Sequence, residues 1–145
     1  GIWIKKFVRM RIDVINLRKL YTLKKAGVKR EEILSLLLPF GTISRKELEE
    51  LAGMELEEMH AKITRRFEEL KGIELSTSLG EIDAKLEITL LKTAEKLMHA
   101  HPLSIAPLIA HVLMKEAEAR NIKLIVRGKQ YGFDDDFIMN NLVVM

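Results

Sequence analysis

The sequence predicts an all-α fold, and three observations support this prediction. Leu, Ile, Ala, Glu, Lys and Arg dominate the composition, and these residues favour helix over sheet. Apolar residues recur at helical spacing along most of the 145 residues, and only three prolines interrupt the chain. A hydrophobic content of 48% is enough to bury a core. The absence of cysteine excludes a disulfide scaffold and a thiolate metal site, and it agrees with a reducing cytoplasm.

Four helices with clear stop signals are predicted in the first half of the chain. Gly27 ends the first helix because glycine adopts the left-handed cap conformation at little cost, and Pro39 ends the second. Ser44 begins the third helix, with Glu47 three residues later completing a capping box. The predicted ranges are 3–26, 30–38, 44–53 and 56–71.

The second half is predicted to contain two long helices and a short one, with Pro102 breaking the first long helix. Residues 122–126 alternate in a way that is also typical of a strand. Helix is favoured there because Glu116 and Arg120 pair at i,i+4 just upstream, and because of the repeat described below. The predicted ranges are a loop over 73–80 and helices over 81–100, 104–131 and 134–143.

The net charge of +3 hides a polarised distribution. Ten lysines and arginines precede Glu31, with Asp13 as the single acid among them, whereas residues 47–58 are rich in glutamate. Such asymmetry suggests an anionic neighbour for the first segment. Nucleic acid, lipid, an acidic protein and the acidic half of this chain all remain candidates.

An internal repeat with a period of about 105 residues is the strongest signal in the sequence. The stretch Asn-Leu-Arg-Lys-Leu that begins at Asn16 reappears as Asn-Ile-Lys-Leu-Ile at Asn121, and Gly27 matches Gly132. A mid-helix asparagine at a repeated position suggests a buried interhelical hydrogen bond that sets the register. We therefore assign structural roles to these two asparagines and two glycines.

The repeat divides the chain into residues 1–38, the end of one helical repeat, and residues 39–145, the final complete repeat. We interpret the start at Gly1, without an initiator methionine, as the cut end of a longer protein. A repeat array that is cut within a unit exposes an apolar face, so self-association of the fragment is expected.

A family resemblance rests on the last third of the chain. Four segments together resemble the C-terminal signature of the C subunit of A/V-type rotary ATPases, the homologue of the V-ATPase d subunit; they are Pro102–Ala110, Lys115–Glu116, Arg120–Ile125 and Arg127–Lys129. Asp13 through Gly27 looks like the same motif in the preceding repeat, with Thr22 where the family often has arginine.

This resemblance implies an all-helical protein with pseudo-threefold repeats and the shape of a funnel. In the family, that protein is a central-stalk rotor subunit of an A-type ATP synthase. It is a socket that couples the central shaft to the membrane rotor ring for proton- or sodium-driven ATP synthesis. The implied location is the cytoplasmic face of the membrane, held peripherally through the complex. The implied partners are the shaft subunits and the ring, without nucleic acid, catalysis or a cofactor.

Partner-binding roles are carried over to four cations of the better-matched motif, Arg120, Lys123, Arg127 and Lys129. Cations on a helix surface can also be a solvated face with local pairs such as Glu116–Arg120. The residues alone leave both interpretations open.

The sequence carries no catalytic or metal-binding constellation. The four histidines lack a zinc-ligand spacing, and no Gly-rich phosphate loop is present. Asp134, Asp135 and Asp136 are interpreted as a helix cap because the twelve-residue calcium pattern is absent. We therefore predict a protein that is not an enzyme and holds no metal.

The alternative function is a DNA-binding module over residues 42–76. Residues 44–53 resemble the first helix and turn of a helix-turn-helix. Residues 55–71 could be a recognition helix that exposes Lys62, Thr64, Arg65 and Arg66, and residues 73–76 could begin a wing. Its net acidity argues against this function, because glutamates would approach phosphates.

Overall fold

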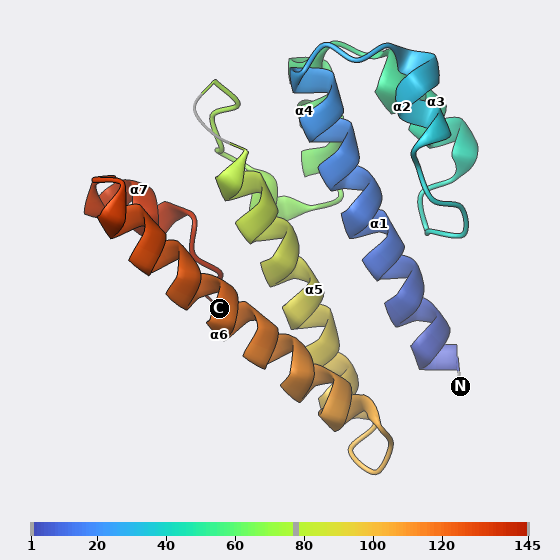
Figure 1. The fold of residues 1–145 in the computed structure, drawn as a ribbon. Coiled ribbons are helices and arrows are strands. Elements are labelled where there is room, and N and C mark those ends of the chain that lie inside the picture. Colours follow the sequence, from blue (N-terminus) through green and yellow to red (C-terminus); the bar gives the residue numbers. More distant parts are fainter. Residues whose placement is uncertain (1, 77–78, 145) are drawn as a thin grey trace. The chain divides into compact units, whose positions relative to one another are not determined.

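The computed structural model describes residues 2–76 and 79–144, and these residues form helices and turns without a strand. The all-α prediction is therefore confirmed. The chain separates into two compact units, Gly1–Leu79 and Gly80–Met145 (Figure 1). This division is defined by contacts between residues in space. The predicted boundary between residues 38 and 39 separates two sequence repeats instead, and it stays a prediction.

The first unit is built on one long helix. Four shorter helical elements follow it, and α2, α3 and α4 all contact α1. The most deeply buried apolar side chains of the unit include Leu17, Leu20 and Tyr21 of α1 and Met59 of α4. The elements are α1 (Ile2–Lys25), α2 (Arg30–Ser35), α3 (Arg45–Gly53), α4 (Leu56–Thr64) and the 3-10 turn η1 (Glu68–Leu70).

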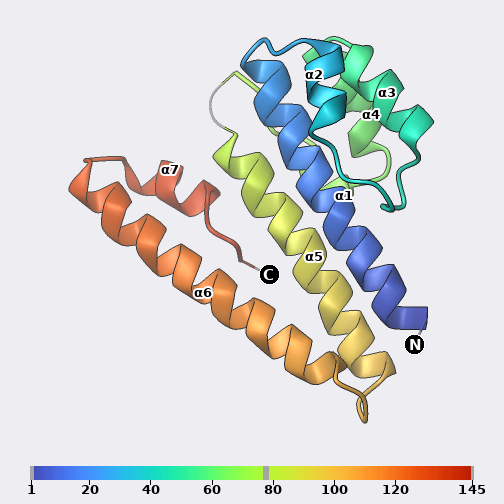
Figure 2. The same cartoon turned by 45° about the vertical axis from the view of Figure 1, so that its right-hand side comes forward.

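The second unit is a long helical hairpin with a short third helix. Helices α5 and α6 run side by side in opposite directions, and α7 folds back on the end of α6 (Figures 1 and 2). The buried residues of α5 include Ile82, Leu86, Leu90 and Ala94, which recur at helical spacing along one side of the helix. The elements are α5 (Gly80–Ala100), α6 (Ala106–Gln130) and α7 (Asp135–Asn140).

The two short helices α2 and α7 end earlier than the sequence predicts, and both for the same reason. The side chain of Asn16 binds both backbone groups of Leu38, accepting from its N–H at 2.8 Å and donating to its carbonyl at 2.9 Å. Asn121 binds Val143 in the same way, at 2.8 Å for both bonds. These bonds pull the chain out of helical geometry after Ser35 and after Asn140.

The helix predicted over 56–71 is wrong in its second half, because α4 ends at Thr64. The Thr64 hydroxyl donates to the Ala61 carbonyl at 2.9 Å, and the chain then turns so that Phe67 is buried. Arg66 lies over the Phe67 ring at 5.9 Å and also donates to the Thr42 hydroxyl. Tertiary contacts of this kind override local helix preference.

The predicted helix starts are mostly confirmed. The Ser44 hydroxyl accepts from the Glu47 N–H, and Asp134 accepts from the Phe137 N–H, so both residues cap helices. Helix α6 has Ile105 rather than Ser104 at its cap position, although the Ser104 hydroxyl accepts from the Ala106 N–H. Residues 77 and 78 of the predicted 73–80 loop lie outside the described residues.

Helix α6 continues without a break through residues 122–126, so the choice of helix over strand is confirmed. None of the helices in the described parts of the chain is both long enough and apolar enough to cross a bilayer.

Candidate partner-binding surface on helix α6

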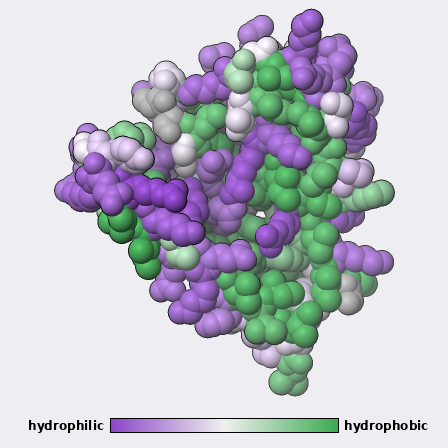
Figure 3. All heavy atoms as spheres, in the orientation of Figure 1, coloured by the Kyte–Doolittle hydropathy of each residue, from purple (hydrophilic) through white to green (hydrophobic). Residues whose placement is uncertain are grey.

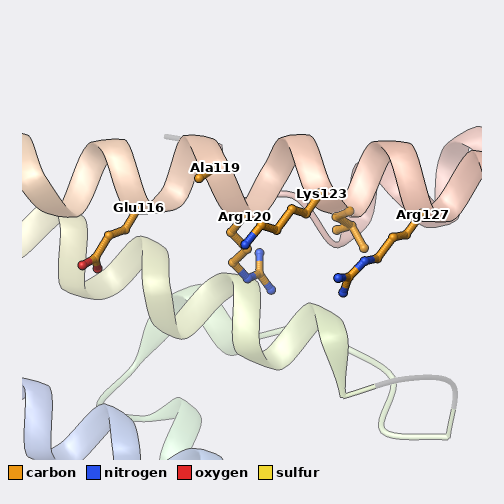
Figure 4. A pocket seen from close by; sticks show the side chains of 6 residues that line it. Glu116, Ala119, Arg120, Lys123 and Arg127 are labelled. Carbon is orange, nitrogen blue, oxygen red and sulfur yellow. The ribbon is translucent and has the colours of Figure 1, made fainter.

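Three of the four predicted partner-binding cations lie on one face of α6. Arg120, Lys123 and Arg127 follow each other at spacings of three and four residues, which places them in one row. Their side chains project from the same side of the helix into an open hollow (Figure 4). The other lining residues of this hollow are Glu116, Ala119 and Leu124.

Two of these cations, Lys123 and Arg127, are exposed, whereas Arg120 is half-buried. Arg120 Nη1 donates to the Asn141 carbonyl oxygen at 3.2 Å, so this guanidinium also holds the end of α7. No ion pair joins Arg120 to Glu116 among the residues that the structure describes. The row therefore presents two solvent-facing cations, Lys123 and Arg127, and a third, Arg120, whose guanidinium is held by the Asn141 carbonyl.

The fourth cation, Lys129, does not belong to this row. Its ammonium group pairs with the Asp135 carboxylate at the start of α7, and both side chains are largely exposed. An exposed pair of this kind contributes little stability. Lys129 therefore already has an anionic neighbour within its own unit.

A row of cations beside a hydrophobic helix face can bind an anionic surface, because each contact is charge-assisted and the row sets its direction. In residues 2–76 and 79–144, no group of three histidine, aspartate or glutamate side chains is placed to hold a metal ion. The row of cations is therefore the feature of this surface that could contact an anionic partner.

The repeated glycines cap α1 and α6 in the same way. Gly27 has φ +77° and Gly132 has φ +75°, both in the left-handed region. In each cap the glycine N–H and the next residue's N–H return to carbonyls of the last helical turn, in the pattern of a Schellman motif. Together with the asparagine bonds, this makes the two segments match hydrogen bond by hydrogen bond at an offset of 105 residues.

The basic first segment binds within its own unit, chiefly through carbonyl oxygens. Lys19 donates to the Leu36 carbonyl at 2.7 Å and Lys24 to the Ala52 carbonyl at 2.9 Å. Arg9 and Arg30 also donate to backbone carbonyls, those of Gly41 and Glu49. Several of the cations that suggested an external anionic neighbour therefore have partners in the chain itself.

The predicted recognition helix of a DNA-binding module is short, because α4 ends at Thr64, and two cations of the predicted segment lie near glutamates. Lys62 pairs with Glu50 at 3.0 Å, and Arg66 lies 4.0 Å from Glu47. These carboxylates offset the positive charge that a DNA phosphate would need. The geometry does not favour the DNA-binding alternative.

Two features were missed by sequence reasoning. Tyr21 Oη lies 2.6 Å from His60 Nδ1, a partly buried contact between residues 39 positions apart that no local pattern signals. The second feature is the exposure of the apolar residues Leu108 and Val112 of α6. Helical periodicity identifies an apolar face but cannot say which of two faces a neighbour covers.

The fold and this surface define a class, an all-helical protein with a row of cations along one long helix. The chain belongs to the ATP synthase (C/AC39) subunit family, whose family model matches residues 1–141.

Curated relatives agree with this assignment. The A-type ATP synthase C subunit of Methanococcoides burtonii is 36% identical over 144 residues, covering 96% of this chain and 40% of the relative. The C subunit of Methanosarcina barkeri is 34% identical, with 97% of this chain and 40% of the relative covered. The C subunit of Pyrococcus abyssi is 31% identical, with 84% and 35% covered. The chain thus spans about two fifths of the length of these relatives, and no solved structure matches it.

Proposed function

We propose that this chain is part of a central-stalk rotor subunit, a socket that couples the central shaft of an A-type ATP synthase to its membrane rotor ring. The subunit transmits rotation driven by protons or sodium ions and performs no chemistry itself. It lies on the cytoplasmic face of the membrane and is held there by the complex. Membership of the ATP synthase (C/AC39) subunit family is the observation that carries this proposal.

The cation row on α6 is the proposed contact with a partner of the complex. Arg120, Lys123 and Arg127 are held on a helix that packs along α5, so their spacing is set by the hairpin and not by a loop. Rows of fixed charges recognise an acidic protein surface and also orient it. Lys129 stays a predicted contact that must first give up its Asp135 pair.

Packed helices suit the transmission of torque. Protein interiors are close-packed and hardly compressible, so a twist applied at one end of a helical hairpin is passed on with little loss. The buried α5 residues Ile82, Leu86 and Leu90 give the second unit such an interior. The proposal therefore needs only binding and stiffness, both of which this architecture can supply.

The test uses the Methanococcoides burtonii C subunit in which the matched 144 residues are replaced by this chain. This protein should bind the shaft subunits and the rotor ring of that synthase in a pull-down. The double variant Lys123→Glu/Arg127→Glu should weaken binding to one of the two partners by about 10- to 100-fold, because two favourable charges become repulsive. The loss should shrink at high salt, because exposed charges are screened over about 8 Å at physiological ionic strength.

Lys96→Glu is the matched control, since Lys96 is exposed on α5 away from the row. It reverses one charge on the same hairpin, whereas the row variant reverses two, and it should leave binding unchanged. If the unsubstituted protein binds neither shaft nor ring while those two bind each other, the rotor-socket proposal fails. If both charge reversals act alike, the cation row is not the contact.

A further inference from the structure

The side of α6 that is opposite its buried residues carries an apolar stripe. Helix α6 contacts α5 and α7, and Ala110 and Leu113 are among the residues buried there. At 3.6 residues per turn, the stripe lies about 180° around the helix from those residues. Its members are Leu108, Val112, Ala119, Ile122 and Val126, all of them exposed.

Helix α1 shows what happens to the same stripe when neighbours are present. The matching caps and asparagine bonds put α1 and α6 in register at an offset of 105 residues, so Leu17 corresponds to Ile122 and Tyr21 to Val126. Leu17 and Tyr21 are 0% and 1% exposed, whereas Ile122 and Val126 are 61% and 51% exposed. One surface is thus used twice in the chain and is covered only once.

The helix pair α3–α4 covers the Tyr21 end of α1. Tyr21 Oη lies 2.6 Å from His60 Nδ1 of α4, and the two rings meet edge to face at 5.7 Å. Lys24, one turn further on, donates to the Ala52 carbonyl of α3 at 2.9 Å. The chain therefore already contains a helix pair, α3–α4, that packs against a long helix at these residues.

The opposite face of α1 is open, as the correspondence between the two repeats requires. Ile4, Val8 and Ile12 line an apolar hollow together with Phe40, and Figure 3 shows hydrophobic side chains at the surface in the region of α1. In register, Val8 corresponds to Leu113, which is buried in the α5–α6 unit. Each long helix thus buries the face that its counterpart leaves open, and both faces are built for helical neighbours.

We propose that the apolar stripe of α6 is a docking face for a helix pair of the α3–α4 type, supplied by the part of the full-length protein that this chain does not span. The matched region is only 40% of the Methanococcoides burtonii relative, which leaves the longer part to supply the pair. A second copy of this chain is a poor source, because Leu51 and Met59 of its own α3–α4 pair are already buried.

Glu118 gives this docking face a polar anchor. It corresponds to Asp13, whose buried carboxylate accepts from the Ile43 N–H at 3.1 Å and from the Thr42 hydroxyl just before α3. Glu118 is exposed, and its ion pair with Lys115, at 3.2 Å, joins two largely exposed side chains and contributes little stability. A docked pair would bring the same kind of donors, at the start of its first helix, to the Glu118 carboxylate.

Cysteine labelling tests the proposal, because the chain has no cysteine of its own. Ile122→Cys is placed in the 145-residue chain and in a cysteine-free Methanococcoides burtonii relative, full length, that carries this chain in place of its matched 144 residues. The maleimide reaction should be slower in the full-length protein by at least about 100-fold, because labelling there needs local opening. Shaft subunits and ring are left out.

Two further variants serve as controls. Leu103→Cys, at a fully exposed apolar residue outside the stripe, should react equally fast in both proteins. Leu17→Cys should stay protected in both and reports that each protein is folded.

Three results would overturn the proposal. The first is equally fast labelling of Ile122→Cys in both proteins while Leu17→Cys remains protected. The second is slow labelling in the 145-residue chain that speeds up on dilution, which would identify a second copy as the occupant. The third is protection that develops only after shaft subunits or ring are added, which would identify a separate protein. Because the supporting result needs neither partner, its failure leaves the rotor-socket proposal standing.

Discussion

Asn16 and Asn121 show how a single side chain can end a helix at a distance. Each side-chain amide binds the backbone N–H and carbonyl of a residue 22 positions later, Leu38 for Asn16 and Val143 for Asn121. These backbone groups are then not available for helical hydrogen bonds, so α2 and α7 end before them. A composition that favours helix is thus overruled by one well-placed donor and acceptor.

Replacement of Asn16 should therefore be costly. Asn16→Ala is expected to lower the free energy of unfolding by about 2 kcal/mol, because a 1% exposed amide leaves two backbone groups without their partner. Asn121→Ala should cost about 1 kcal/mol, since Asn121 is half-buried. Urea titration followed by circular dichroism measures both losses. Asn140→Ala, at an exposed position of α7, is the control, and a cost equal to that of Asn16→Ala would contradict the structural role.

The Tyr21–His60 contact makes stability depend on pH. Burial lowers the pKa of His60 below its ordinary 6.5, so below that pH the unfolded chain binds more protons than the folded one. The free energy of unfolding should fall as the pH drops from about 7 through 6.5 towards the lowered pKa. His60→Gln should flatten this dependence, whereas His111→Gln, at an exposed histidine, should not. Urea titrations at a series of pH values decide this, and identical slopes in both variants would refute it.

Burial also raises the pKa of Tyr21 above its ordinary value of 10.0. The folded chain then holds this proton where the unfolded chain loses it, so the corresponding stability is present below pH 10.0 and is lost as the pH rises beyond it. In the folded chain, absorbance titration should show Tyr21 ionising well above pH 10.0, and Tyr21→Phe should remove this late step. Ionisation of Tyr21 near pH 10.0 in the folded state would contradict the raised pKa.

At the scale of the element, α7 can pack against the end of α6 only because residue 128 is a glycine, which leaves room for Ile138. A Cβ on Gly128 would come within 2.8 Å of Ile138 Cδ1 and Cγ1, and Ile138 is buried. The Arg-Gly-Lys motif that supported the family resemblance thus has a packing reason at its central position.

Gly128→Ala should destabilise the chain by about 1–3 kcal/mol, the usual cost of overpacking. The cost should shrink when Ile138→Ala removes the side chain that the new Cβ would meet, so a double-mutant cycle measures the coupling. Gly132→Ala is the matched control. It should cost about 1 kcal/mol in either background, because its cost comes from a positive φ and not from Ile138. Equal coupling for both glycines would rule out this explanation.

At the scale of the whole molecule, the distribution of charge argues against a nucleic-acid function. The pI of about 9.1 would suit DNA binding, yet several cations of the first unit bind carbonyl oxygens or glutamates of their own unit. A positive net charge attracts DNA nonspecifically only where the cations are not already paired with groups of the protein itself.

The chain should therefore bind a random DNA duplex only weakly at physiological salt, with an affinity no tighter than the nonspecific range of about 10⁻⁴ to 10⁻⁶ M. Glu47→Gln/Glu50→Gln, which removes the carboxylates near Lys62 and Arg66, should strengthen binding. Fluorescence anisotropy over a salt series is the measurement. Tight and steeply salt-dependent binding by the unsubstituted chain would instead support the DNA-binding module.

The sequence by itself determined the class of fold and the approximate place of each helix, because helical spacing, caps and breakers are local properties. Gly27, Ser44, Asp134 and Pro102 act within one or two turns, and their effects were predictable for that reason. The similarity between the segments at Asn16 and Asn121 was also readable, although their hydrogen-bond partners were not.

Only the tertiary structure decided which of two possible faces of α6 is buried and where α2, α4 and α7 end. It also separated Lys129 from the row of Arg120, Lys123 and Arg127, through an ion pair with Asp135. These outcomes depend on contacts between residues that are distant in sequence, such as Tyr21 with His60, and no local pattern encodes the partner of such a contact. Local chemistry specifies which elements form, whereas packing between elements specifies which of their faces remain available for binding.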